Sequence, residues 1–382
     1  QTTIGEFCPF KYGKGLSAKD RLSGNFPVYG SNGVVGFHNE VYVKTHGIVI
    51  GRKGSVGALH LSDGPFWPID TSFYVVKEDY FETVYTYYLL RSLGLDRMNS
   101  DSAVPGLNRD NVHALKINIF DMKEERSAIG KLISKFDDKI ENNRRMNETL
   151  EEMAQAIFKS WFVDFDPVHA KAAGNAPAHM DANTAALFPS SFGDDGLPVG
   201  WKYKKLEDIS DLSWGDLNTT KKSYVETGFD AYSASGKDGK LPHFDFEKLG
   251  VVLSAIGANC GRTWLARGKW SCIKNTIRFW SKCKSTPTIF LFHTTRGNNF
   301  WPIRGSAQPF ISQGDARSQK AIVPANGEAV SFGGIVGGYF EKISTNEDEN
   351  KTLAELRDTL LPKLMSGEIR VADAEREVKA VV

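Results

Sequence analysis

The feature that most constrains this chain of 382 residues is an internal repeat, because much of its first half recurs 203 residues later. One register holds from the region of Tyr29 to that of Met153, which is longer than scattered coincidence allows. The matched pairs include Tyr29 with Tyr232, Gly33 with Gly236, Gly36 with Gly239, Trp67 with Trp270, Glu125 with Glu328, Ile140 with Ile343, Asn143 with Asn346, Asn147 with Asn350 and Leu150 with Leu353. In a few places the offset between matching residues is slightly larger, as where Ile50 matches Ile256, and these changes predict insertions in loops. We therefore expect two similar globules, each followed by a similar helix, an arrangement that suits a target with two similar parts.

Composition places the chain among ordinary globular proteins, since 41% of its residues are hydrophobic and 24% are charged. No apolar run approaches the roughly 20 residues that a membrane helix needs, and residues 1–10 lack the pattern of a secretory signal. The four cysteines have no metal-ligand spacing, so we expect reduced thiols. These features predict a cytoplasmic protein that does not bind membranes.

The sequence pattern predicts an α+β fold in which two similar globular α/β domains are separated by two long antiparallel helices, with a pseudo-twofold internal repeat. Apolar runs closed by glycine indicate strands and tight turns in both globules. A segment rich in Ala, Pro, Gly and Ser indicates an extended connector. The predicted segments are a first globule at 1–118, a helix at 119–163, the connector at 164–200, a second globule at 201–324, a second helix at 325–366 and a C-terminal tail at 367–382.

Apolar residues recur every three or four positions across residues 124–162, which predicts one helix of 39 residues and about 60 Å. Its copy spans residues 327–365, where Gly333 and Gly334 weaken the first turns. Pro362 is expected to kink or end this second helix near Leu361.

Asparagines interrupt the apolar stripe of both predicted helices, at Asn143, Asn147, Asn346 and Asn350. Positions 143 and 346 are the midpoints of the two spans, so these layers would meet at the centre of an antiparallel pair. A buried Asn layer costs stability but fixes the register of the helices. The alternative is that these side chains face solvent.

Positive charge is unevenly distributed along the chain, although the net charge is only +1. Residues 201–324 contain 19 Lys and Arg against 10 Asp and Glu, whereas residues 1–118 contain 12 against 11. An excess of this kind suits a nucleic-acid partner, and a solvated surface is the plainer alternative.

The motifs of a self-contained enzyme are absent from the sequence. There is no phosphate-binding loop of the Gly-x-x-x-x-Gly-Lys type, no His-x-x-x-His pair, no Gly-x-Ser-x-Gly and no Asn-Pro-Pro-aromatic motif. Asp164 and Asp166 lack further ligands and are expected to be solvated rather than metal-bound. We therefore predict no catalytic residue and no metal site.

The remaining candidates are residues that suit DNA contacts, because Arg and Lys bind phosphate and guanine whereas Asn and Gln bind adenine. They lie in glycine-rich turns and in the corresponding turns of the second copy, where the side chains differ. An ordinary role in a turn is the alternative for each of them. The candidates are Ser31, Asn32, Arg52, Lys53, Asn108 and Arg109 in the first globule, and Ser233, Ser235, Lys237, Asn259, Arg262, Lys274, Gln308, Ser312 and Gln313 in the second.

Several stretches resemble the specificity subunit of type I DNA restriction-modification systems, and the resemblance covers nearly the whole chain. They are PVYGSNGVVG at 27–36, GIVIGRKGSV at 47–56, FWPID at 66–70, FKSWFVDFDPV at 158–168 and LAELRDTLLPKLMSGEIRV at 353–371. The family order of recognition domain, helical spacer, recognition domain and spacer is the order of the repeat.

The resemblance implies that residues 1–118 and 201–324 are target recognition domains for double-stranded DNA with a two-part target and an unread gap. It also implies that the helices dock two modification subunits, which use S-adenosylmethionine to methylate adenine. Through them the chain would meet restriction subunits that use ATP and Mg, so this chain itself would be a non-catalytic specificity subunit without a cofactor. The alternatives are a coiled-coil scaffold that does not bind DNA and an enzyme that acts alone.

Overall fold

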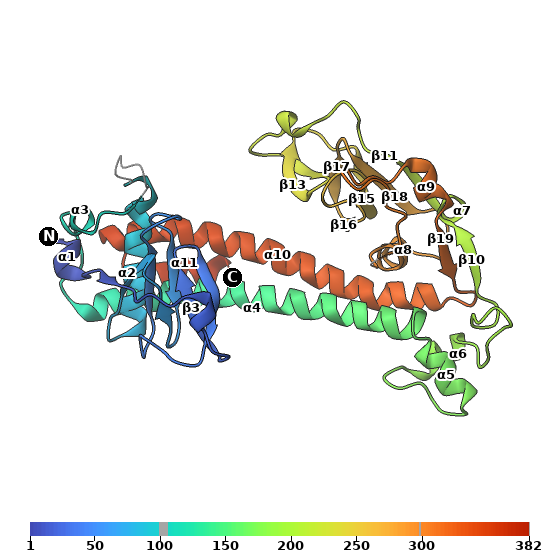
Figure 1. The fold of residues 1–382 in the computed structure, drawn as a ribbon, viewed down its shortest axis with the longest axis horizontal. Coiled ribbons are helices and arrows are strands. Elements are labelled where there is room, and N and C mark those ends of the chain that lie inside the picture. The colour runs from blue at the N-terminus through green and yellow to red at the C-terminus, as the bar shows by residue number, and fades with distance from the viewer. Residues whose placement is uncertain (99–105, 298, 382) are drawn as a thin grey trace. The chain divides into compact units, whose positions relative to one another are not determined.

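The computed structural model describes residues 1–98, 106–297 and 299–381. It divides into two compact units, Gln1–Arg145 with Asn346–Val382 and Met146–Thr345. Each unit contains one globule and parts of both long helices, so the boundaries between the units fall inside those helices (Figure 1).

The globule of the first unit is built from three small sheets. Strand pairing gives the orders β2-β8-β5-β6, β4-β3-β7 and β1-β9. The elements are β1 (Thr2–Thr3), α1 (Ile4–Phe7), β2 (Lys11–Tyr12), β3 (Phe26–Gly30), β4 (Gly33–His38), β5 (Gly47–Gly51), β6 (Leu59–Ser62), β7 (Trp67–Pro68), β8 (Ser72–Val75), α2 (Tyr80–Ser92), α3 (Arg109–His113) and β9 (Lys116–Ile117). Because β1 pairs with β9, the two ends of this globule meet in one ladder.

The globule of the second unit repeats this plan. Its sheets have the orders β11-β18-β15-β16, β13-β12-β17-β14 and β10-β19. The elements are β10 (Lys202–Lys205), α7 (Leu206–Ile209), β11 (Ser210–Trp214), β12 (Phe229–Ser233), β13 (Gly236–Leu241), β14 (Phe246–Glu247), β15 (Gly250–Ser254), β16 (Thr263–Ala266), β17 (Lys269–Cys272), β18 (Thr276–Ser281), α8 (Thr288–Thr295), α9 (Gln313–Ser318) and β19 (Lys320–Val323).

Strand registers confirm the repeat in detail and correct one part of the sequence alignment. The β3–β4 and β12–β13 hairpins carry the same bulge, after Val28 in the first copy and after Ala231 in the second. Ile50 pairs with Phe73 of β8, and Leu253 pairs with Ile277 of β18. Leu253 is thus the counterpart of Ile50, and the match with Ile256 was wrong because the inserted residue lies in the following turn. The predicted fold class, two similar mixed globules with long helices, is confirmed.

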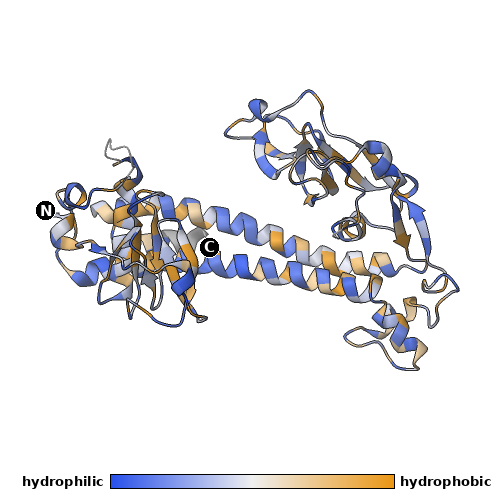
Figure 2. Ribbon diagram, viewed as in Figure 1, coloured by the Kyte–Doolittle hydropathy of each residue, from blue (hydrophilic) through white to orange (hydrophobic). Residues whose placement is uncertain are grey.

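The two long helices are α4 (Lys123–Phe162) and α10 (Glu328–Ser366), and Figure 2 shows hydrophobic and hydrophilic residues alternating along α4. Within the first unit they run antiparallel, since Asp137 accepts a hydrogen bond from Arg357 at 2.7 Å while Asn143 meets Asn350 at 2.9 Å. Of the two effects expected of Pro362, an end of the helix near Leu361 is excluded, because α10 continues through the proline to Ser366. Buried Leu360 and Leu364 on either side of the proline supply packing that outweighs the lost backbone hydrogen bond.

The asparagines of the two long helices contact each other in the first unit. Asn143 and Asn346 are 2% and 0% exposed, so neither faces solvent. The Asn143 side-chain amide donates to Asn350 at 2.9 Å and to Glu349 at 2.8 Å, so an asparagine of α4 meets an asparagine of α10, as expected for an antiparallel pair. A role of Asn147 and the other three asparagines in fixing the register stays a proposal.

A polar network ties the first globule to the long helices of its own unit. Tyr88 on α2 donates to Asp137 at 2.6 Å, and Arg357 donates to the other oxygen of the same carboxylate at 2.7 Å. The corresponding residues of the second copy are Leu291, Phe340 and Ala154, which are buried members of one apolar cluster. The two globules therefore pack on their helices with different chemistry.

The segment between α4 and the second globule was predicted to be extended, and this expectation was wrong. It contains α5 (Asp166–Ala172) and α6 (Ala182–Leu187). Val168, Phe188 and Leu197 are buried with Trp201 in the core of the second unit. Few apolar residues suffice here because their partners come from α4 and α10. Outside this segment, the tail after α10 contains α11 (Val371–Val381).

The core of the second unit contains a buried histidine, His293 on α8. Its ring stacks on Phe158 at 5.7 Å between centroids, and its Nε2 atom has no hydrogen-bond partner among the described residues. Burial, together with the nearby Arg296 cation, lowers the pKa of His293 to about 3. The folded protein thus holds this imidazole neutral.

We expect the second unit to lose stability as pH falls from about 7.5 to 5, because the unfolded chain gains a proton on His293 near pH 6.5 and the folded chain does not. The loss attributable to this residue is about 2 kcal/mol at pH 5, and His293→Leu should remove it. The free energy of unfolding in urea at both pH values measures the effect. His243→Leu, an exposed site in the same unit, is the matched control. An unchanged pH dependence in His293→Leu would contradict the prediction.

Candidate nucleic-acid interface

Three turns of the first globule converge and bring all six candidate residues together. The turn with Ser31 and Asn32 joins β3 to β4, and Asn32 accepts a hydrogen bond from Ser55 in the turn after β5 at 3.4 Å. In that second turn, the backbone of Lys53 pairs with that of Gly106 in an antiparallel β-bridge. The third turn, with Asn108 and Arg109, is joined through the backbone because Leu107 donates to the Arg52 carbonyl at 2.9 Å.

Two arginines from different turns meet on one aromatic ring. The guanidinium carbons of Arg52 and Arg109 lie 5.0 and 4.9 Å from the centre of the Tyr12 ring. Arg52 also donates to the Asp70 carbonyl at 3.2 Å and lies 5.8 Å from the Phe73 ring. Sequence analysis missed Tyr12, whose position depends on the long-range pairing of β2 with β8.

Asn108 has a structural task in addition to any contact with DNA. Its side-chain oxygen accepts hydrogen bonds from the backbone N–H groups of Asp110 and Asn111 at 2.9 and 3.1 Å. Asn108 therefore caps α3. Among the described residues its amide hydrogens have no hydrogen-bond acceptor, whereas its oxygen is engaged.

The second globule gathers its candidates in the same way. The turn after β15 with Asn259 and Arg262 lies against the segment that carries Gln308, because Gly257 donates to the Pro309 carbonyl at 2.9 Å. The turn before β18, which carries Lys274, lies against the turn after β15, since the Ala255 N–H donates to the Asn275 carbonyl at 3.0 Å.

A shallow hollow lies beside these turns. Lys274, Ser233 and Ser235 line it together with Lys221 and Lys222, a basic pair that sequence analysis did not select. The adjacent Lys-Lys doublet was the signal that could have found them. Lys222 and Lys274 are exposed, so two ammonium groups face solvent at this hollow and suit phosphate.

Several candidates of the second globule are engaged internally. Ser233 is 2% exposed and donates to Asp238 at 2.7 Å, so in this conformation its hydroxyl does not reach a ligand. Ser312 caps α9, with its hydroxyl accepting from the Asp315 N–H at 3.0 Å. Gln313 donates to the Leu212 carbonyl at 3.4 Å.

The equivalent hairpin strands β4 and β13 have the same backbone pairing but carry different side chains. At β4, Val34, Val35 and Phe37 are 49%, 43% and 56% exposed. The same positions of β13 are Lys237, Asp238 and Lys240, all three of which form ion pairs. Although burial opposes it, hydrogen bonds from Lys221, Ser233 and Tyr224 lower the pKa of Asp238. Equivalent strands thus present apolar chemistry in one copy and charged chemistry in the other.

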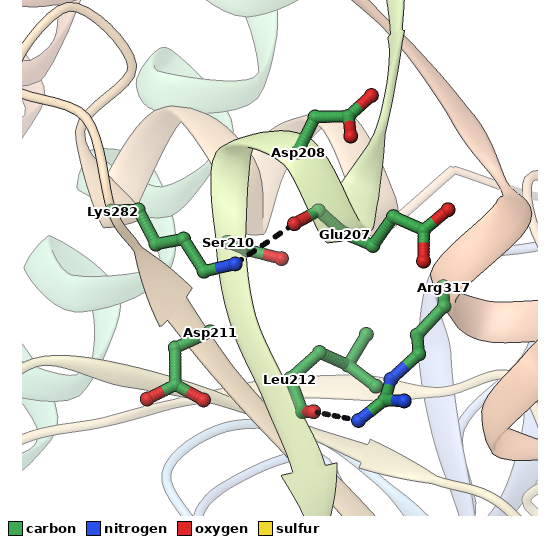
Figure 3. A pocket seen from close by; sticks show the side chains of 7 residues that line it. All are labelled: Glu207, Asp208, Ser210, Asp211, Leu212, Lys282 and Arg317. Atoms are coloured by element: carbon green, nitrogen blue, oxygen red, sulfur yellow. Dashed lines mark hydrogen bonds between the residues drawn. The ribbon is translucent and has the colours of Figure 1, made fainter.

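Figure 3 shows a second hollow of this unit, near the start of β11. Lys282 donates to the Glu207 carbonyl at 2.9 Å and Arg317 donates to that of Leu212 at 3.4 Å. Three carboxylates, of Glu207, Asp208 and Asp211, line the same hollow. None of the candidate residues lines it, and its carboxylates do not suit a polyanion.

Two further properties of the described residues bear on the interface. In the part of the chain that the structure describes, no group of three or more His, Cys, Asp or Glu residues could hold a metal ion. Within the same residues, no helix combines the length and apolar character needed to cross a bilayer.

Comparison with known proteins shows which family the chain resembles. Residues 1–152 match the model of the type I restriction modification DNA specificity domain family. The chain is 23% identical over 352 residues to the type I restriction enzyme MjaIX specificity subunit of Methanocaldococcus jannaschii, covering 85% of this chain and 78% of the relative. It is 29% identical over 334 residues to the HindI specificity subunit of Haemophilus influenzae, covering 69% of this chain and 71% of that relative.

A solved structure shares the fold. The crystal structure of a type I restriction-modification S subunit from M. genitalium superposes with a TM-score of 0.64 at 19% identity and covers 95% of both chains. The resemblance to type I specificity subunits that the sequence predicted is confirmed.

Proposed function

We propose that this chain is the DNA-recognition subunit of a type I restriction-modification complex. Each globule binds one half of a two-part duplex target, and the bases between the halves are not recognised. The observation that carries the proposal is that the two globules share one fold, while their equivalent converging turns carry different side chains. The match of residues 1–152 to the model of the DNA specificity domain family supports it.

The proposal extends to the partners. The long helices would dock two modification subunits, which supply S-adenosylmethionine and adenine methylation, and through them restriction subunits that use ATP and Mg. This chain would be non-catalytic. Double-stranded DNA is its direct ligand, with Lys53, Lys222, Arg262 and Lys274 available as exposed cations.

Binding of the full chain to duplex DNA in the presence of modification subunits tests the proposal. Affinity should fall steeply between about 50 and 200 mM salt, because bound phosphates release counterions. Mapping methylated adenines in cells that contain the complex should show two short conserved segments with a constant gap. A salt-independent response would favour a scaffold that does not bind DNA, and S-adenosylmethionine binding by the isolated chain would favour an enzyme that acts alone.

The second globule should contribute more phosphate contacts than the first. Arg262 and Lys274 are exposed and have no ion-pair partner within the described ranges, whereas Arg52 is held against Tyr12 and Asp70. Replacing Arg262 and Lys274 by Ala should lower the slope of log affinity against log salt by about 2. Replacing Arg52 and Lys53 should lower it by about 1. Filter binding at several salt concentrations measures both slopes, and equal slopes would refute the difference.

A further inference from the structure

The arginines on Tyr12 are held more firmly than a contact with phosphate requires. Arg52 is fixed by the Asp70 carbonyl at 3.2 Å and by two rings, those of Tyr12 at 5.0 Å and Phe73 at 5.8 Å. Arg109 begins α3 and lies 4.9 Å from the same Tyr12 ring. Stacking on a ring fixes the plane of a guanidinium and leaves N–H groups on its edge free.

A fixed plane matters more for base contacts than for phosphate contacts. A phosphate accepts hydrogen bonds from many directions, so a guanidinium can bind it in several bidentate orientations and a mobile lysine can bind it as a point charge. Guanine offers O6 and N7 side by side in the major groove, which matches two parallel N–H groups of one guanidinium. Two pre-oriented guanidiniums beside the turn of Ser31 and Asn32 therefore suit guanine edges.

The second copy keeps the ring and lacks both arginines. Phe73 and Ile277 are counterparts, because they pair with the equivalent residues Ile50 and Leu253. Tyr12 pairs with Phe73, and Trp214 pairs with Ile277. Trp214 is therefore the counterpart of Tyr12. By the same registers, Ala255 stands where the first copy has Arg52. Gln313 follows the Ser312 cap as Arg109 follows the Asn108 cap. The cluster is thus peculiar to the first globule.

We propose that Arg52 and Arg109, held over Tyr12, determine the sequence of the first half-site by donating to guanine in the major groove. Tyr12 is a positioning residue that sets the plane of both guanidiniums. This inference rests on the proposed function and assigns the chemical class of base that the first recognition domain selects.

The test is selection of bound duplexes from a randomised library by the full chain with its modification subunits. Arg52→Lys and Arg109→Lys keep the charge and lose the bidentate edge, so each should reduce the preference for guanine at one position of the first half-site by about 5- to 150-fold. The second half-site and the salt slope should not change. Tyr12→Leu should weaken guanine preference at the same positions, and Tyr12→Phe, which keeps the ring, should retain it.

Arg91→Lys is the matched control, because Arg91 lies 5.8 Å from the Tyr88 ring in the same globule but belongs to α2 and to none of the three turns. It should leave both half-sites unchanged. Unaltered guanine preference in both lysine variants would overturn the inference and assign Arg52 and Arg109 to phosphate. Failure of the unsubstituted complex to enrich any duplex would instead refute the proposed function.

Discussion

A chain in which residues 1–118 are replaced by a second copy of residues 201–324 is expected to recognise the second half-site twice. The first half-site should disappear from the target completely. The junctions follow the structure, because β1 pairs with β9 and β10 pairs with β19, so each transferred segment contains both strands that close its globule. The reason for the expected result is that each globule has its own sheets and its own converging turns.

The exchange needs two compensating substitutions. Transfer would place Leu291 where Tyr88 now bonds Asp137, so the carboxylate would lose the hydrogen bond from Tyr88. Arg357 would lose the Tyr88 ring, whose centre lies 5.7 Å from its guanidinium carbon, in a partly buried site. Such unmatched groups destabilise a core. Asp137→Phe and Arg357→Ala install the apolar set of the second copy, so the compensated chain should fold and the uncompensated chain should be less stable.

Methylation mapping of cells that contain the compensated chain checks the prediction. Two copies of the same short sequence, on opposite strands, should flank the gap. Retention of the original first half-site would mean that residues outside 1–118 select its bases. The change of Asp137 and Arg357 alone, without the exchange, is the control for effects of the helices.

The repeat and the helical periodicity allowed much of this fold to be predicted from the sequence. Both depend on local spacing, and the predicted first helix at 124–162 differs from α4 by one residue at its start. The connector was predicted wrongly because the burial of Phe188 and Trp201 depends on partners from distant helices. The sequence could not decide whether Pro362 kinks or ends the helix for a similar reason, since the packing of Leu360 and Leu364 is invisible to a rule about single residues.

The sequence predicted which turns carry the candidate residues, but it did not predict how their side chains are arranged in space. Glycine-rich turns drew attention to Arg52 and Arg109, which the structure places on one ring. Tyr12 escaped because only the pairing of β2 with β8 brings it there. Ser233 was chosen by its position in a turn, yet its hydroxyl is directed to Asp238. Spacing along the chain locates a turn, but side-chain direction depends on its tertiary neighbours.

Lengthening both long helices is expected to lengthen the gap between the two half-sites, if the helices set the distance between the recognition domains. One added heptad extends a helix by about 10 Å and keeps the apolar stripe in register. Duplex DNA rises about 3.4 Å per base pair, so the gap should grow by about three base pairs. The insertions belong directly after Asn143 in α4 and directly before Asn350 in α10, because these residues face each other at 2.9 Å.

The rotation of the DNA helix makes this prediction sharper. About three extra base pairs turn the second half-site by roughly 100°, since one turn takes about 10.5 base pairs. The heptad barely rotates the protein helices, so the one-heptad variant should have strongly reduced activity. Three heptads add about 31 Å, or about nine base pairs, which nearly restores the phase of the groove. This longer variant should methylate targets whose gap is larger by about nine base pairs.

Insertion of three heptads into α4 alone is the control, because it shifts the part of α4 after Asn143 out of register with the part of α10 before Asn350 and should prevent folding of the helix pair. Methylation mapping of the double insertion decides the matter. An active variant with the original gap would show that the helices do not set the spacing. Activity on the longer gap alone would show that the spacing follows the helix length, because the insertion leaves every candidate DNA contact in both globules unchanged.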